Sequence, residues 1–258
     1  MLLRAGLASV RHMSDTGEGG GNPVGLGGEF AAFTTADFEL LEEMDTAGPD
    51  RSVHLTERAD ALWAKAERLV GELAAGLFGA DNYSAAIWPD SAGEERLPFI
   101  WARLKRSGNQ SYATHIGVFL SPGFCNLSVD LEKDLLDAGE SAETLEQVVG
   151  FFGSQFASIS RDLATDVRVW TDTRNVVGVA GFAALDFDRF MADNHDADHP
   201  WPKVGYMFTA ADVAGFAERW VEEYRGRAAP LVPMYDAMIN GFGRAQGASQ
   251  KKGPGSTS

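Results

Sequence analysis

The stretch YATHIGVFLSPGFCNLSVDL, from Tyr112 to Leu131, decides the fold. Apolar and β-branched residues run through Tyr112–Leu120 and again through Phe124–Leu131, and the intervening Ser121-Pro122-Gly123 is a turn sequence. Two such runs joined by a short turn are typical of an antiparallel hairpin. Further strands are predicted at Ala85–Trp88, Phe99–Arg106, Val167–Trp170 and Val176–Val179.

Helical patterns occur in the chain both before and after these strands. Apolar residues recur three and four positions apart in each of them, and capping residues or prolines mark their starts. This order favours an α+β protein, with an antiparallel sheet of roughly four to six strands packed by helices on one side. The predicted helices are Thr35 to Gly48, Thr56 to Gly79, Ala142–Leu163, a turn at Phe187–Asn194, Thr209 to Tyr224, and one from Pro230 to about Gly241.

The two ends of the chain differ in composition from its middle. Residues 1–29 are rich in glycine, and residues 243–258 are rich in Gly, Ser, Gln and Lys, so both are expected to be disordered. Residues 30–242 are then a single α+β domain. The first dozen residues carry arginines and no acid, but we favour a start codon assigned too early over a targeting peptide.

The charge and the cysteine content limit the possible partners. The net charge is −15, so the molecule as a whole repels nucleic acid and anionic membranes, and any such contact needs a local basic patch. No stretch is apolar enough to span a bilayer, and we expect a soluble protein. Cys125 is the single cysteine, which suits a reducing cytoplasm and suggests a small buried residue. No pattern indicates an oligomeric state.

One part of this acidic chain carries no acid. Between Arg96 and Val129 there is no Asp or Glu, although four basic residues fall in this window. A strand would place cations and rings on one surface, which suits phosphates and bases. We therefore predict a non-catalytic binding module, without a cofactor, that takes an anionic ligand or nucleic acid on this hairpin. The predicted ligand-binding residues are Trp101, Arg103, Lys105, Arg106, Tyr112 and His115. The alternative is an ordinary strand face whose cations are offset by acidic helices.

A second cluster offers a different function. His195 and His199 are four residues apart, with Asp198 between them, and such a pair can bind a metal on a helix. A metal-assisted hydrolase using a divalent ion at His195, Asp198 and His199 is thus the alternative. Pro200 follows at once, however, and the glutamate of the zinc-protease motif is absent, which favours a solvated acidic loop.

Several enzyme classes are excluded because the chain lacks their sequence motifs. The chain has no Walker A sequence, no dinucleotide-binding glycine pattern after a strand, and no G-x-S-x-G. The segment Asp130-Leu131-Glu132-Lys133 has leucine where a restriction-type nuclease core needs an acid.

Three segments resemble a bacterial family, the domain-of-unknown-function family 2461. They are FTTADFELL at Phe33–Leu41, YATHIGVFL at Tyr112–Leu120, and Asp198-His199-Pro200 followed by a helix and Ala229–Val232. This resemblance implies an α+β fold and leaves function open, because that family has no assigned activity. The hairpin pattern of Leu97–Trp101 and Asn126–Leu131 also resembles the DNA-recognition domain of McrB-type restriction systems, which implies DNA binding.

Overall fold

The structure is a computed structural model that describes residues 32–48, 53–88, 97–171, 175–195 and 200–250. The predicted leader, residues 1–29, lies outside the described residues, as does the end of the predicted tail. Among the helices that are described, none has both the length and the apolar character needed to cross a membrane.

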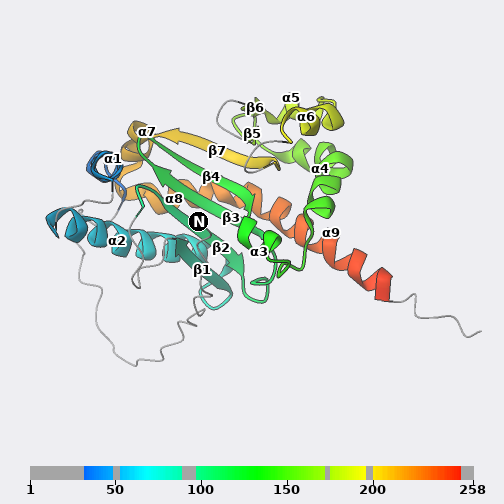
Figure 1. Ribbon diagram of the computed structural model, residues 1–258, viewed down its shortest axis with the longest axis horizontal. Helices are drawn as coiled ribbons and strands as arrows, with labels where there is room; N and C mark the ends of the chain where they lie inside the picture. The colour runs from blue at the N-terminus through cyan, green and yellow to red at the C-terminus, as the bar shows by residue number, and fades with distance from the viewer. Residues whose placement is uncertain (1–31, 49–52, 89–96, 172–174, 196–199, 251–258) are drawn as a thin grey trace, which may run out of the picture.

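One antiparallel sheet organises the chain. Its strands follow the order β1-β2-β3-β4-β7-β5-β6 (Figure 1). The prediction of an α+β protein with an antiparallel sheet is confirmed, and the sheet has seven strands, slightly more than expected. The strands are β1 (Tyr83–Trp88), β2 (Ile100–Arg106), β3 (Thr114–Ser121), β4 (Phe124–Leu131), β5 (Arg168–Trp170), β6 (Val177–Gly178) and β7 (Lys203–Thr209).

The β3–β4 hairpin forms at the stretch that the sequence singled out. Ser121 pairs with Phe124 across Pro122-Gly123, and Gly123 has a φ of 83°, a conformation that glycine adopts without strain. Each residue back from the turn then pairs in register as far as Thr114 and Leu131. This register sets which side chains share a face.

Helices pack on one side of the sheet. In Figure 1, α9 passes behind the strands, and α2 and α8 lie on that side as well. The helices are α1 (Thr35–Ala47), α2 (Val53–Phe78), α3 (Lys133–Asp137), α4 (Leu145–Ile159), α5 (Val179–Ala183), α6 (Phe187–Asp193), α7 (Ala210–Phe216), α8 (Trp220–Ala228) and α9 (Val232–Gln250), with 3-10 turns at Ser160–Asp162, Ala217–Arg219 and Ala229–Leu231.

The core lies between these helices and the alternate residues of the strands. Ile100, Ala102 and Leu104 of β2 are fully buried on this side. On β4, the Cys125 thiol lies 2.9 Å from the Tyr224 hydroxyl of α8, and burial raises the pKa of Cys125 to about 12. Cys125 is thus the buried residue that we expected, and it has no thiolate chemistry at neutral pH.

Polar side chains fix the starts of the helices. At α1, Asp37 accepts hydrogen bonds from the backbone and the hydroxyl of Thr34, as the predicted N-cap requires. The same carboxylate pairs with Lys65 of α2 at 2.7 Å, and both side chains are nearly buried. This contact joins the first two helices. Gly48 and Gly79 end them with φ values of 61° and 95°.

Three elements differ from the prediction. Strand β7 was missed, because Gly205 interrupts its pattern and prolines precede it. The predicted helix from Thr209 to Tyr224 is divided into α7 and α8 at Ala217, which has a φ of 47°. Helix α9 continues past Gly241 to Gln250, so it is longer than the predicted last helix.

Candidate functional site

The face of the sheet opposite the helices, here called the polar face, carries the predicted basic residues. Trp101, Arg103 and Lys105 alternate with the core residues of β2 and so point to this side, as the strand pattern predicts. Next to Arg103 and Lys105, the residues of β3 and β4 on this face are polar or small, namely His115, Gly117, Ser128 and Asp130, whereas Trp101 pairs with Phe119.

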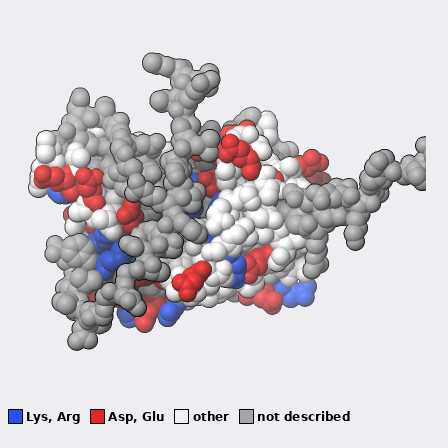
Figure 2. Space-filling view, turned by 90° about the horizontal axis from the view of Figure 1, so that it is seen from below, with Lys and Arg blue, Asp and Glu red and all other residues white. Residues whose placement is uncertain are grey.

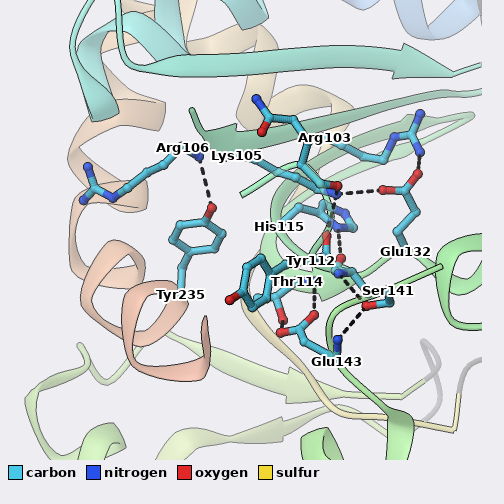
Figure 3. Close-up of polar contacts among 12 residues, drawn as sticks. Arg103, Lys105, Arg106, Tyr112, Thr114, His115, Glu132, Ser141, Glu143 and Tyr235 are labelled. Atoms are coloured by element: carbon cyan, nitrogen blue, oxygen red, sulfur yellow. Dashed lines mark hydrogen bonds and ion pairs between the residues drawn. The ribbon is translucent and has the colours of Figure 1, made fainter. Parts of the chain in front are cut away.

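Glu132 neutralises two of the predicted cations. It follows β4 and accepts from the guanidinium of Arg103 and from Lys105 Nζ, the latter at 3.0 Å (Figure 3). Lys105 Nζ also donates to the carbonyl of Tyr112 at 2.6 Å. Burial and the neighbouring Arg103 lower the pKa of Lys105 to about 8. The two cations are therefore held inside a polar network and do not form a freely exposed patch.

Arg106 does not join this group. It forms a two-pronged ion pair with Asp236 of α9, at 2.8 and 2.9 Å, and its backbone N–H donates to the hydroxyl of Tyr235. The hydrogen bond to Asp236 raises the pKa of Arg106. Figure 3 shows its side chain pointing away from Lys105 and toward the helices. Including Arg106 among the residues of one binding face was wrong, because successive strand residues point to opposite sides.

Tyr112 lies at the edge of the site. Its ring is half-buried against the core, and its contribution to the network is the carbonyl that accepts from Lys105. Nearby, Glu143 accepts from the amide and the hydroxyl of Thr114, and burial raises the pKa of Glu143. This carboxylate is thus the part of the polar network that binds the first residue of β3.

His115 is fully buried on β3 and is neutral. Its Nδ1 lies 3.1 Å from the carbonyl of Ala113, so Nδ1 is the protonated nitrogen and Nε2 carries the lone pair. Desolvation by burial lowers its pKa to about 3, although Asp130 opposes this. His115 is therefore a hydrogen-bond acceptor at Nε2.

The buried histidine predicts acid sensitivity. An unfolded histidine has an ordinary pKa of 6.5, whereas the folded value is about 3, so the unfolded state binds the proton in between. Stability is then complete above pH 6.5 and is lost as the pH falls toward 3. For His115→Asn, we expect the loss of unfolding free energy between about pH 7.5 and about pH 5 to shrink by about 2 kcal/mol.

Urea unfolding at the two pH values measures this effect. The matched control is His54→Asn, because it is the same substitution at an exposed histidine of α2. An equal pH dependence in His115→Asn and the parent would show that His115 does not carry the acid sensitivity.

Asp130 is held as a carboxylate beside His115. Burial alone would raise its pKa, but Lys203, His115 and Trp201 together lower it below the ordinary value. The indole of Trp201 donates to Asp130 Oδ1 at 2.9 Å, and Lys203 pairs with the other oxygen at 3.4 Å. This acid is thus satisfied within the protein.

Three other buried polar atoms on the polar face make no hydrogen bond within the described part of the chain. They belong to His115 and to the two ladder partners of Gly117 of β3, and the group of Arg103, His115, Gly117 and Ser128 is here called the Gly117 cluster. Arg103 and Ser128 are the ladder partners of Gly117 on its two sides. Within the described part of the chain, the buried atoms Arg103 Nε, His115 Nε2 and Ser128 Oγ have no hydrogen-bond partner.

Because Gly117 has no side chain, the position above it lies next to His115 and Trp101. A methyl group in its place would lie 3.3 Å from His115 Nε2 and 3.5 Å from the indole nitrogen of Trp101. Trp101 also packs edge-on against the His115 ring, and the Arg103 guanidinium lies 5.3 Å from its ring centre. The cluster therefore presents N–H donors from Arg103 and Trp101, an acceptor on His115, and the hydroxyl of Ser128.

The second predicted cluster is described only in part. His195 is exposed after α6, and its Nδ1 lies 2.7 Å from the carbonyl of Ala192. Asp198 and His199 lie outside the described residues, so the predicted metal site stays a prediction. In the ranges that the structure does describe, no group of three His, Cys, Asp or Glu residues could hold a metal.

Cations and carboxylates are also mixed on the molecular surface. On the face drawn in Figure 2, Lys and Arg groups of the described residues are interspersed with Asp and Glu.

No family model matches this chain, and no curated protein matches it. The resemblances to family 2461 and to the McrB-type domain therefore stay predictions, and the geometry of the polar face carries the functional argument.

Proposed function

We propose that this chain is a binding domain that takes a small anionic ligand at the Gly117 cluster. The observation that carries the proposal is the set of three buried polar atoms without a partner among the described residues. A buried donor or acceptor that makes no hydrogen bond costs about 1–3 kcal/mol, so such atoms are rare unless they meet a ligand or water. Here three of them belong to His115 and to the two ladder partners of one glycine, Gly117.

An unused N–H of Arg103 supports an anion as the ligand. Arg103, Lys105 and Lys203 lie on this side of the sheet with the carboxylates Asp130 and Glu132, and Asp134 and Glu143 also stabilise the charges of Arg103 and Lys105. Arg103 retains an N–H that Glu132 does not use, and burial strengthens the attraction that it exerts on an anionic oxygen. Trp101 adds a second N–H and a ring next to it.

The same geometry favours a small ligand over a nucleic-acid strand. A polymer needs a line of accessible Lys and Arg side chains along its phosphates. The Lys105 side chain is only 7% exposed, and Arg106 pairs with α9 on the other face. Trp101 and Arg103, by contrast, are half-buried and so retain part of their surface for a ligand.

A binding role without catalysis also suits the chemistry of the cluster. A histidine with a pKa of about 3 is too weak a base to take a proton from a substrate at neutral pH. The only thiol of the chain, Cys125, points to the opposite face. We propose the reducing cytoplasm as the setting, because a single buried cysteine suits it.

Gly117→Ala tests the proposal. The added methyl group would fill the space next to His115 Nε2 and Trp101, so we expect anion binding to weaken at least about 10-fold, which is 1.4 kcal/mol. The probe is inorganic phosphate, followed by the amide shifts of Gly117 and Ser128 in nuclear magnetic resonance titrations. Gly178→Ala in β6 is the matched control, because nothing lies within 4 Å of that position.

Two results would overturn the proposal. One is that phosphate at millimolar concentration moves neither amide. The other is that it binds equally well to the parent, to Gly117→Ala and to Gly178→Ala. Tight, salt-dependent binding of a single-stranded oligonucleotide that Gly117→Ala does not weaken would instead place a polyanion site elsewhere on the molecule.

A further inference from the structure

We infer that the anionic ligand carries a planar aromatic ring, which lies against a row of rings beside the Gly117 cluster. This inference rests on the proposed function and adds the chemical class of the ligand. The rings, here called the aromatic row, are those of Trp88, Phe99, Phe119 and Phe124.

The aromatic row is continuous across four strands of the polar face. The ring centres are 5.4 Å apart from Trp88 to Phe99, 5.4 Å from Phe99 to Phe119, and 5.9 Å from Phe119 to Phe124. Trp101 pairs across the ladder with both Trp88 and Phe119, and its indole nitrogen lies beside Gly117. Trp101 thus lies between the aromatic row and the Gly117 cluster.

These rings are not part of the hydrophobic core. Each of them is half-buried, and none belongs to the core cluster or to the partly buried residues that pack against it. Met207 of β7 extends the same apolar surface across the sheet. A group of large apolar side chains outside the core marks a surface that binds something.

The position of the row relative to the cations indicates what binds there. Phe119 follows Gly117 by two residues, which places it about 7 Å farther along the same face. A ligand that offers an oxygen to Arg103 can therefore rest a ring on Trp101 and Phe119 at the same time. Stacking of a base on an aromatic side chain contributes about 1–3 kcal/mol. A ligand in which a ring is joined to a phosphate or a carboxylate can make both contacts, with its anionic group at Arg103 and its ring on the aromatic side chains.

Four probes separate the contributions of ring and anion. They are inorganic phosphate, adenosine, adenosine monophosphate and indole-3-acetate, each titrated by calorimetry against the purified full chain. We expect a ring-bearing anion to bind at least about 10-fold more tightly than phosphate or adenosine. The last two probes differ in both ring and anionic group, so tight binding of either one supports the inference.

Phe119→Leu identifies the surface that holds the ring. Leucine keeps an apolar side chain and removes the ring, so we expect the affinity for the best ring-bearing anion to fall about 10-fold while phosphate binding is unchanged. Phe187→Leu in α6 is the matched control, because Phe187 is also half-buried but packs edge-on against Phe182, which belongs to the core.

The possible results separate this inference from the proposed function. If phosphate binds and the ring adds nothing, or Phe119→Leu binds as the parent does, the ring inference is wrong and the anion site remains. If no probe binds, the proposed function fails as well. A second copy of the chain could also cover the aromatic row, and sedimentation of the parent and of Phe119→Leu tests this. If the parent is a dimer that Phe119→Leu dissociates, the row is a subunit interface and the inference is wrong.

Discussion

Glu132→Gln should lower the free energy of unfolding by about 3 kcal/mol, because it leaves two nearly buried cations without their counter-charge. The side chains of Arg103 and Lys105 are 18% and 7% exposed, and both pair with this carboxylate. Glutamine keeps the shape of the side chain and removes the charge. Glu143 also stabilises the charge of Lys105, and this limits the loss. Urea unfolding near neutral pH measures the change.

The control for this prediction is a pair of the same kind on the surface. Lys133 and Asp137 form an ion pair on α3 with side chains 40% and 60% exposed, so Lys133→Ala should change stability by less than about 1 kcal/mol. Adding Lys105→Met to Glu132→Gln should recover part of the loss, since one unpaired cation is then removed. If Glu132→Gln costs no more than Lys133→Ala, Glu132 does not hold the two cations in place.

Gly205→Ala should destabilise the chain by about 4 kcal/mol or more, among the largest effects of a single substitution. A Cβ atom at this position would lie 1.9 Å from the carbonyl oxygen of Leu127 and 2.6 Å from the Cα of Ser128. Both atoms belong to the backbone of β4, so they cannot move aside without separating β4 from β7. The strand β7 is also the only link between β4 and β5 in the described sheet.

Hydrogen exchange shows where this damage occurs. Amides of β5 and β7 should lose protection in Gly205→Ala, because β5 pairs with β7 at Arg168 to Trp170. Gly178→Ala is again the control, and it should change stability by less than about 1 kcal/mol. An unchanged urea midpoint in Gly205→Ala would mean that β4 and β7 are not as close as described.

The hairpin could be predicted because local patterns determine it. The turn at Ser121–Gly123 fixes the register, and counting back from it pairs Gly117 with Ser128 and His115 with Asp130. The alternation along β2 likewise placed Trp101, Arg103 and Lys105 on one face. These pairs are accessible from sequence because strand geometry repeats every two residues.

Other features depend on contacts between distant parts of the chain. The role of Glu132 follows from the way that the end of β4 lies beside β2, and only its position just after the acid-free window hinted at it. The burial and low pKa of His115 depend on what packs around it, which periodicity does not show. Strand β7 was missed because Gly205, required by the close approach to β4, weakened its pattern.

The position of β7 also has a consequence for synthesis of the protein. On the ribosome, β1 to β4 emerge first and can pair with one another in chain order. The strands β5 and β6 come next, but they attach to the sheet through β7, which ends at Thr209. The strands β5 and β6 can therefore join the sheet only after β7 has been made, when more than four-fifths of this sequence has been translated. Until then the edge of β4 is unpaired, and an unpaired strand edge can pair with the wrong segment.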